Sequence, residues 1–192
     1  HNLELEVGPG VLIPRPETEC LVELAIRLAP PGGSVLDLGT GSGAITLALA
    51  VARPDLRLTA IDASPAALKW AVRNANRLGL AGRVEFRCGD LFAPLDTPGP
   101  SAINGRSNPL AKSADSTPLA RKYHLIVANL PYLREDERPT LPREIREWEP
   151  ETALFAGADG LAAIRRAIAE VDPVERAALR IALDVLLRLL AP

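Results

Sequence analysis

Four short apolar runs, separated by segments with helical spacing, constrain this chain more than any other feature of its sequence. Each run has the length of a single buried strand. Strands that alternate with helices are typical of a doubly wound α/β fold, in which most strands run parallel. We therefore expect one α/β domain with a mainly parallel sheet. The predicted strands are SVLDLG (34–39), LRLTAID (56–62), RVEFRCGD (83–90) and YHLIVANLP (123–131).

The segments between the runs carry apolar residues at the spacing of a helix face. Thr18 is expected to cap the first helix, since Thr accepts hydrogen bonds from free N–H groups at helix starts. Ser64 is expected to cap the third, with Pro65 at its first position. Near the end of the chain, Asp172 caps a last helix. The predicted helices cover residues 17–28, 44–52, 64–80 and, as two helices, 160–191.

The domain organisation follows from these elements and from two less regular stretches. Residues 3–13 alternate apolar and polar around Gly-Pro-Gly and are predicted to form a β-hairpin. Residues 34–133 form the ligand-binding α/β unit. Within it, residues 96–121 are rich in Pro, Ser, Ala, Asn and Gly without apolar periodicity. They are expected to be a mobile surface insertion, so residues 1–192 form one domain.

Composition excludes several classes of function. The net charge of −2 gives no overall attraction to nucleic acid or to an anionic membrane. No apolar run approaches the roughly 20 residues that a membrane-spanning helix needs, and no signal peptide is recognisable. Cys20 and Cys88 lack metal-type spacing, so we expect small core residues, no metal site and a reducing, cytoplasmic setting.

The first strand ends in a glycine-rich turn, GTGSG, that carries the strongest local chemistry. Gly39, Gly41 and Gly43 leave room for a ligand to touch the backbone between a strand and a helix. Asp37 stands just before the turn, placed to organise the loop or to meet a positively charged group through water. Nucleotide, flavin and sulfonium cofactors all use such loops, so the turn alone does not choose among them.

Two further acids follow the next strands. Asp62 ends the second strand, where a carboxylate can accept hydrogen bonds from both hydroxyls of a ribose. Asp90 ends the third, where it could hold the exocyclic amino group of adenine. Because ligands bind at the carboxyl ends of parallel strands, the three acids are expected to face one crevice. The sequence therefore predicts a nucleoside site.

The spacing of the glycines favours a nucleoside without phosphate. Dinucleotide loops space their glycines as G-x-G-x-x-G and receive pyrophosphate on the helix start. Here acids surround the loop, and no lysine or arginine stands beside it for a phosphate. A cationic nucleoside, S-adenosylmethionine, fits this description best, and NAD is the alternative.

At this point the sequence resembles a known family, the release-factor glutamine methyltransferases. These enzymes methylate the side-chain amide of the glutamine in the Gly-Gly-Gln loop of peptide chain release factors. The resemblance implies a Rossmann-like methyltransferase fold that uses S-adenosylmethionine and binds a release factor, with neither nucleic acid nor membrane as partner. It rests on VLIPRPETE (11–19), VLDLGTGSGAI (35–45), Asp62, GDLF (89–92), NLPY (129–132) and EPETALFAGADGL (149–161).

The family implies site residues at the matching positions. Asn129 would serve both halves of the site, and Asn129, Pro131 and Tyr132 would be catalytic. Arg15 and Pro16 would border the substrate pocket. The substrate-binding positions are Asn129, Leu130, Pro131, Tyr132, Arg15 and Pro16. The cofactor-binding positions are Asp37, Gly39, Thr40, Gly41, Ser42, Gly43, Asp62, Asp90, Leu91 and Asn129.

NLPY suits a reaction at an amide nitrogen, whose lone pair is delocalised into the carbonyl. The side-chain oxygen of Asn129 and the backbone carbonyl of Leu130 can accept hydrogen bonds from both amide N–H groups. Pro131 fixes the backbone, and Tyr132 offers a flat wall for the planar amide. The usual family motif is Asn-Pro-Pro-Tyr, so Leu130 is a departure. His124 is expected to be structural and Trp148 to be packed.

Alternatives remain open at the level of sequence. Asn-Leu-Pro-Tyr is also the pattern of ribosomal RNA adenine dimethyltransferases, although those need basic surface. A glutamine of a ribosomal protein is a second possible substrate. The family also implies an N-terminal helical domain before this chain and further strands after it. We therefore expect a catalytic core without its C-terminal strands, or else an inactive cofactor-binding remnant.

Overall fold

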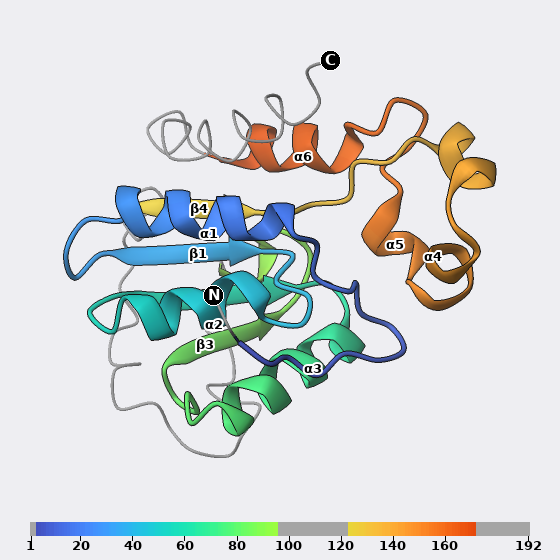
Figure 1. Cartoon of the computed structure of the whole chain (residues 1–192). Helices are drawn as coiled ribbons and strands as arrows, with labels where there is room; N and C mark the ends of the chain where they lie inside the picture. The colour runs from blue at the N-terminus through green and yellow to red at the C-terminus, as the bar shows by residue number, and fades with distance from the viewer. Residues whose placement is uncertain (1–2, 96–122, 172–192) are drawn as a thin grey trace.

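A four-stranded parallel sheet forms the centre of the molecule in a computed structural model that describes residues 3–95 and 123–171 (Figure 1). The strand order is β3-β2-β1-β4, and β1 pairs with β2 on one side and with β4 on the other. All four predicted strands are confirmed. They are β1 (Ser34–Leu38), β2 (Arg57–Asp62), β3 (Val84–Cys88) and β4 (Leu125–Ala128).

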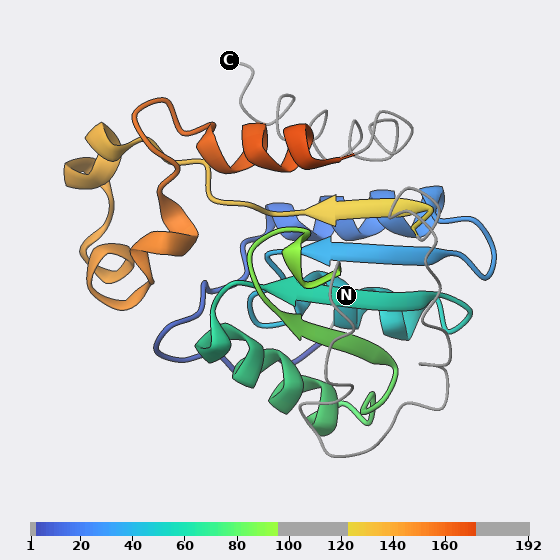
Figure 2. The same ribbon diagram turned by 180° about the vertical axis from the view of Figure 1, so that it is seen from behind.

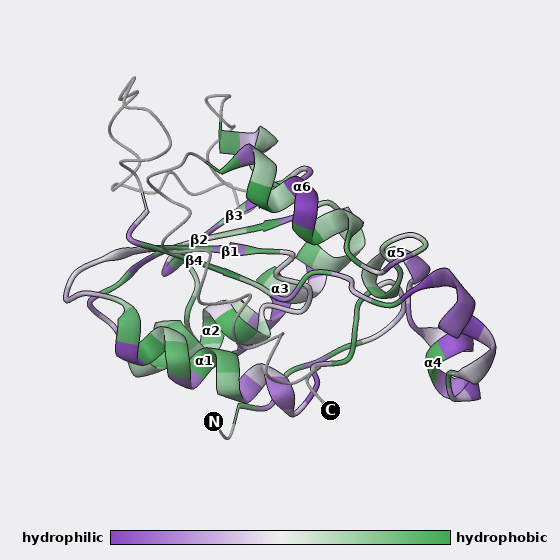
Figure 3. Cartoon of the chain, turned by 90° about the horizontal axis from the view of Figure 1, so that it is seen from above, coloured by the Kyte–Doolittle hydropathy of each residue, from purple (hydrophilic) through white to green (hydrophobic). Residues whose placement is uncertain are grey.

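Helices cover both faces of this sheet, as predicted for a doubly wound fold. Figure 3 shows the sheet edge-on, with α1 (Glu17–Leu28) and α2 (Ala44–Ala52) on one side and α6 (Ala162–Glu170) on the other. Alternate residues of β1 feed two separate cores. Val35 packs in the core of α1 and α2, whereas Leu36 and Leu38 pack in the core of α6. Burial on both faces explains why the strands read as continuous apolar runs.

The helix starts are partly as predicted. α3 (Pro65–Arg77) begins behind Ser64, whose Oγ accepts a hydrogen bond from the Ala67 N–H at 3.2 Å. The prediction that Thr18 caps α1 is wrong, because the capping position belongs to Pro16. Thr18 lies inside the first turn, buried, and its N–H donates to the Arg15 carbonyl at 3.0 Å.

The predicted β-hairpin over residues 3–13 is wrong. These residues form no strand, and they run along α3 instead, held by a buried side chain of that helix and by ion pairs on the surface. The Asn74 carboxamide accepts a hydrogen bond from the Glu6 N–H at 2.8 Å and donates to the Glu6 carbonyl at 2.9 Å. It also donates to the Ser42 carbonyl at 3.0 Å. Asn74 thereby satisfies both backbone groups of Glu6, for which a hairpin would have supplied partners.

Residues 133–161 fold into short helices beyond the carboxyl ends of the strands (Figures 1 and 2). No predicted helix or strand covered residues 133–159. Leu133 bridges to Phe155: its N–H donates to the Leu154 carbonyl, and its carbonyl accepts from the Ala156 N–H, both at 2.9 Å. The elements are η3 (Glu135–Thr140), α4 (Arg143–Trp148) and α5 (Glu151–Leu154), and η1 (Ala93–Leu95) follows β3.

Not all predictions about the rest of the chain are confirmed. Cys20 and Cys88 are exposed free thiols, so their assignment to the core was wrong. The first of the two C-terminal helices is α6, while the second lies outside the described residues, as does the predicted insertion at 96–121. Within the described parts, no helix is long and apolar enough to cross a membrane.

Candidate functional site

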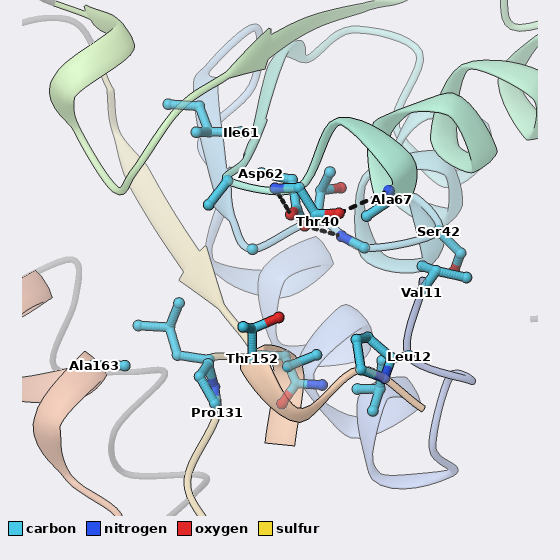
Figure 4. A pocket seen from close by; sticks show the side chains of 18 of the residues that line it. Val11, Leu12, Thr40, Ser42, Ile61, Asp62, Ala67, Pro131, Thr152 and Ala163 are labelled. Atoms are coloured by element: carbon cyan, nitrogen blue, oxygen red, sulfur yellow. Dashed lines mark hydrogen bonds between the residues drawn. The ribbon is translucent and has the colours of Figure 1, made fainter. Parts of the chain in front are cut away.

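A cleft of about 390 Å³ opens at the carboxyl ends of the strands, where a parallel sheet is expected to bind its ligand. Its volume lies within the range of small-molecule sites. Figure 4 shows Thr40 and Asp62 on one side of the cleft, facing Pro131 and Thr152 on the other. We call these sides the cofactor half and the substrate half, after the roles that the sequence predicts for them. The predicted glycine loop and the predicted NLPY motif therefore meet in one cavity.

The glycine loop depends on left-handed backbone at three positions. Gly39, Gly41 and Gly43 have φ angles of 71°, 58° and 86°, which side-chain-bearing residues rarely adopt. A Cβ at Gly39 would lie 3.3 Å from the Cδ2 of Leu130, so this glycine lets the two halves approach. Thr40 and Ser42 line the cleft with Gly39 and Gly41, whereas Gly43 begins α2 and does not.

Most N–H groups of this loop are already used inside the protein. Gly39 and Thr40 both donate to the Ile61 carbonyl, at 2.9 and 3.0 Å. Gly41 donates to the Asp62 Oδ2 at 2.8 Å, and Gly43 donates to the Thr40 carbonyl at 2.9 Å. A dinucleotide loop offers such groups to a pyrophosphate. In this loop, the N–H groups instead stabilise the conformation of the loop itself.

Asp62 lines the cleft and organises the loop beside it. Its Oδ2 accepts from the Gly41 N–H and its Oδ1 from the Ser64 N–H, both at 2.8 Å. Burial raises the pKa of this carboxyl, and the two N–H donors oppose the rise. Each carboxylate oxygen has further lone pairs, so the group can also accept hydrogen bonds from a ligand.

Asp37 lies beneath the loop and does not line the cleft. Its Oδ2 accepts hydrogen bonds from the hydroxyls of Thr40, at 2.7 Å, and Thr46. Its Oδ1 is buried and has no hydrogen-bond partner among the described residues. Burial raises the pKa of Asp37 to about 6 against these two hydrogen bonds, and the negative charge of Asp62 adds to the rise.

The third predicted acid, Asp90, lines the cleft together with Leu91. Its Oδ2 accepts from the Arg166 guanidinium at 2.6 Å, an exposed ion pair that joins the loop after β3 to α6. Leu91 has a φ of 44°, in the left-handed region that residues other than glycine rarely adopt. Arg166 also lines the cleft and was not predicted, since its position on a surface helix gave no signal.

Three of the four NLPY residues line the cleft: Asn129, Leu130 and Pro131. The Asn129 carboxamide is half-buried and makes no hydrogen bond within the described parts of the chain. Tyr132 does not line the cleft and is 38% exposed. A Cβ at Gly160 would lie 2.2 Å from the backbone carbonyl oxygen of Tyr132. This glycine therefore lets the NLPY loop pass close by.

Two segments that are distant in sequence enclose the substrate half. Residues 10–18, the N-terminal wall, contribute Leu12 and Pro14, among others. Residues 150–153, the C-terminal wall, contribute Pro150 and Thr152. The predicted pocket residues Arg15 and Pro16 do not line the cleft. Arg15 donates through Nη2 to both carboxylate oxygens of Glu149, at 2.8 and 2.6 Å.

Several residues of this half escaped the sequence analysis. Thr18, expected as a cap, lines the cleft, and the EPETA stretch contributes a wall although no site role was assigned to it. Trp148 was expected to be packed and is 69% exposed, so that prediction was wrong. His124 is structural as expected: its Nδ1 accepts from the Ser34 N–H at 3.1 Å.

Comparisons with known proteins agree with this geometry. Residues 30–100 match the family model described as a methyltransferase domain. The release factor glutamine methyltransferase of Gloeobacter violaceus is 39% identical over 172 residues, which are 88% of this chain and 52% of that protein. Those of Koribacter versatilis and Vibrio cholerae are 40% and 42% identical, over 89% and 85% of this chain. The chain spans about half the length of these curated relatives.

Proposed function

Because this chain is homologous to release factor glutamine methyltransferases along 85 to 89% of its length, we propose that the protein methylates a glutamine side chain. The methyl donor is S-adenosylmethionine, and the acceptor is the glutamine of the Gly-Gly-Gln loop of a peptide chain release factor. The observation that carries the proposal is the Asn129 carboxamide. It has no partner among the described residues, and it faces the same cleft as the glycine loop.

The residues of the cofactor half fit S-adenosylmethionine. Asp62 keeps free lone pairs toward the cleft for ribose hydroxyls, and Asp90 stands at the next strand end for adenine. The buried Oδ1 of Asp37, without a described partner, suits a cationic group met through water. When bound, the cofactor supplies a methyl group activated by a positively charged sulfur. NAD fits less well, because four of the loop N–H groups are already used within the protein.

The residues of the substrate half fit an amide. An amide NH₂ has two N–H groups, and the Asn129 side-chain oxygen and the Leu130 backbone carbonyl can accept one each. These two bonds aim the nitrogen and hold it still while its bond to the methyl carbon forms and the carbon–sulfur bond breaks. The nitrogen then loses a proton to water. Positioning of this kind can lower a barrier by several kcal/mol, so no strong base is required.

The protein substrate is favoured over ribosomal RNA by charge. Among the described residues that line the cleft, Arg166 is the one cation, and it is paired with Asp90. Proteins that bind RNA need a basic surface for its phosphates, whereas this chain carries a net charge of −2. We propose the cytoplasm as the setting. The free thiols of Cys20 and Cys88 agree with a reducing compartment.

Transfer of a labelled methyl group tests this proposal. The protein, incubated with labelled S-adenosylmethionine and a release factor, is expected to label the release factor. A release factor in which the glutamine of the Gly-Gly-Gln loop is replaced by alanine is expected to stay unlabelled. Label in ribosomal RNA would move the assignment to the adenine methyltransferases. Label in a ribosomal protein with none in the release factor would identify a different glutamine.

A further inference from the structure

The ion pair between Arg15 and Glu149 is unusual among the charges of this molecule. The Glu149 side chain is 2% exposed and the Arg15 side chain 30%, while most other ion pairs of the described residues lie on the surface. Both oxygens of Glu149 accept from the same Nη2, at 2.8 and 2.6 Å. The partners are 134 residues apart in the sequence. A buried carboxylate that loses its counter-charge is strongly destabilising, so this contact is unlike an exposed pair.

The backbone on each side of the pair is stiff. Arg15 stands between Pro14 and Pro16, whose rings fix their own φ angles and restrict the residue before them. Glu149 directly follows α4 and precedes Pro150. Pro14 and Pro150 both line the cleft. The distance between the two charged side chains therefore sets the distance between two prolines of opposite walls.

The two walls are anchored to different parts of the molecule. The residues that follow the C-terminal wall are bound to the residue that follows NLPY, through the hydrogen bonds of Leu133 with Leu154 and Ala156. The N-terminal wall continues from a segment that Asn74 holds against α3. Within the described residues, the Arg15–Glu149 pair is the one ion pair or hydrogen bond that connects residues 10–18 with residues 149–157.

We propose that the Arg15–Glu149 pair is a tie that fixes the width of the substrate half of the cleft. Both residues are positioning residues: they do not line the cleft and act through Pro14 and Pro150. The inference rests on the proposed transfer to an amide, a small planar group that must fit between the walls and NLPY. Misplacement of a reacting group by about 1 Å can lower a rate by about 10²-fold.

Breaking a purely structural ion pair would also destabilise the protein. The test must therefore separate a change in the width of the cleft from a loss of stability. Arg15→Met leaves the Glu149 charge buried and alone. Arg15→Met/Glu149→Met removes both charges at similar volume, an exchange that often restores or raises stability. The double variant therefore recovers folding without recovering a directional bond between the walls. Arg143→Met is the matched control, since Arg143 pairs with Glu147 on the exposed surface of α4.

Five quantities are measured on each variant: the melting temperature, the Kd for S-adenosylhomocysteine, kcat and KM for methyl transfer, and the rate of backbone hydrogen exchange. For Arg15→Met we expect a lower melting temperature and a transfer rate lower by about 10²-fold. For the double variant we expect the melting temperature to return while transfer stays at least about tenfold slow. The Kd should change by less than about threefold in both. Arg143→Met should match the unchanged protein.

Hydrogen exchange tests the proposed role of the Arg15–Glu149 pair even if the proposed substrate is wrong. In the double variant, the amides of residues 11–19 and of residues 149–155 should exchange faster together, although the melting temperature is normal. A double variant with normal transfer and normal exchange would show that the pair only neutralises buried charge, and would overturn the tie. Faster exchange in both walls, with a release factor that remains unlabelled by the unchanged protein, would retain the tie and reject the substrate.

Discussion

Asn129 directly follows β4, and its carboxamide has no hydrogen-bond partner among the described residues, so its removal acts on whatever enters the cleft. We expect Asn129→Ala to lower the rate of methyl transfer by roughly 10²-fold, as when one preorganised polar contact is lost at a transition state. The Kd for S-adenosylhomocysteine should change by only a few-fold. Single-turnover transfer and calorimetry measure the two quantities. A transfer rate close to that of the unchanged protein would show that NLPY is a turn without a role in methyl transfer.

Leu130 is the residue at which this chain departs from the usual Asn-Pro-Pro-Tyr. Its N–H donates no hydrogen bond to any described residue, so proline would delete no internal contact there. Its side chain, however, contacts the α6 core and reaches toward Gly39. We expect Leu130→Pro to keep near-normal transfer, because the working acceptor is a backbone carbonyl. Loss of activity together with stability would assign the essential contact to the leucine side chain.

Asp37 makes stability depend on pH. Because burial raises its pKa from 3.8 to about 6, the folded state holds its proton more tightly than the unfolded state does. Its contribution to stability is therefore full below about pH 4 and is lost as the pH rises through about 6, by about 3 kcal/mol at most. We expect Asp37→Asn to raise the melting temperature relative to the unchanged protein at about pH 8, and not at about pH 4. An equal difference at both pH values would contradict the raised pKa.

At the scale of elements, Asn74 shows how one side chain can stand in for a strand. Its three hydrogen bonds hold the N-terminal segment and the Ser42 carbonyl to α3. We expect Asn74→Ala to lower the free energy of unfolding by about 2–4 kcal/mol, since it leaves three backbone groups without their partner, one of them buried and two partly buried. Chemical denaturation measures the loss. Asn76→Ala, an exposed change on the same helix, is the control and should have little effect.

Asn74 also explains why the sequence predicted a hairpin over residues 3–13. Alternation of apolar and polar residues marks a half-buried extended segment, but it does not say whether a strand or a side chain supplies the hydrogen bonds. The same limit applies to the walls of the cleft. No element was predicted over residues 133–159, because the pairing of Leu133 with Phe155 depends on contacts distant in the sequence. The bounds of α1 were predicted correctly, but Thr18 was expected to cap it because Thr is a favoured capping residue, whereas the capping position belongs to Pro16.

At the scale of the whole molecule, the cleft collects residues from seven separate segments, from Gly10 to Arg166. A ligand that fills it must stabilise the fold as a unit. At about 100 times its Kd, S-adenosylhomocysteine should raise the free energy of unfolding by about 2.7 kcal/mol. A thermal melt should then shift upward by about 5–10 °C. NAD at the same concentration should produce no shift, and a shift with NAD alone would reverse the choice of cofactor.

The whole architecture was the most predictable part. Four apolar runs and the glycine turn were enough to predict the parallel sheet. Of the three predicted acids, Asp62 and Asp90 line the cleft at the carboxyl ends of the strands, whereas Asp37 lies beneath the loop. Periodicity and strand order are local or topological properties, so a sequence reveals them. The substrate half was less predictable. Glu149 looks like an ordinary charged residue in the sequence. Its burial against Arg15 arises only when two segments that are distant in the sequence meet in the fold.

The N–H groups of the glycine loop that are bonded within the protein have a consequence for how other nucleotides of the cell compete for the cleft. ATP carries the same adenosine as S-adenosylmethionine, followed by a chain of phosphates in place of a sulfonium. A loop whose N–H groups bind Ile61, Asp62 and Thr40 has few donors left for those phosphates, and the Asp62 carboxylate repels them. We therefore expect the site to ignore the abundant nucleotide pool without any residue devoted to excluding it. Selectivity against ATP is then a by-product of how the loop folds.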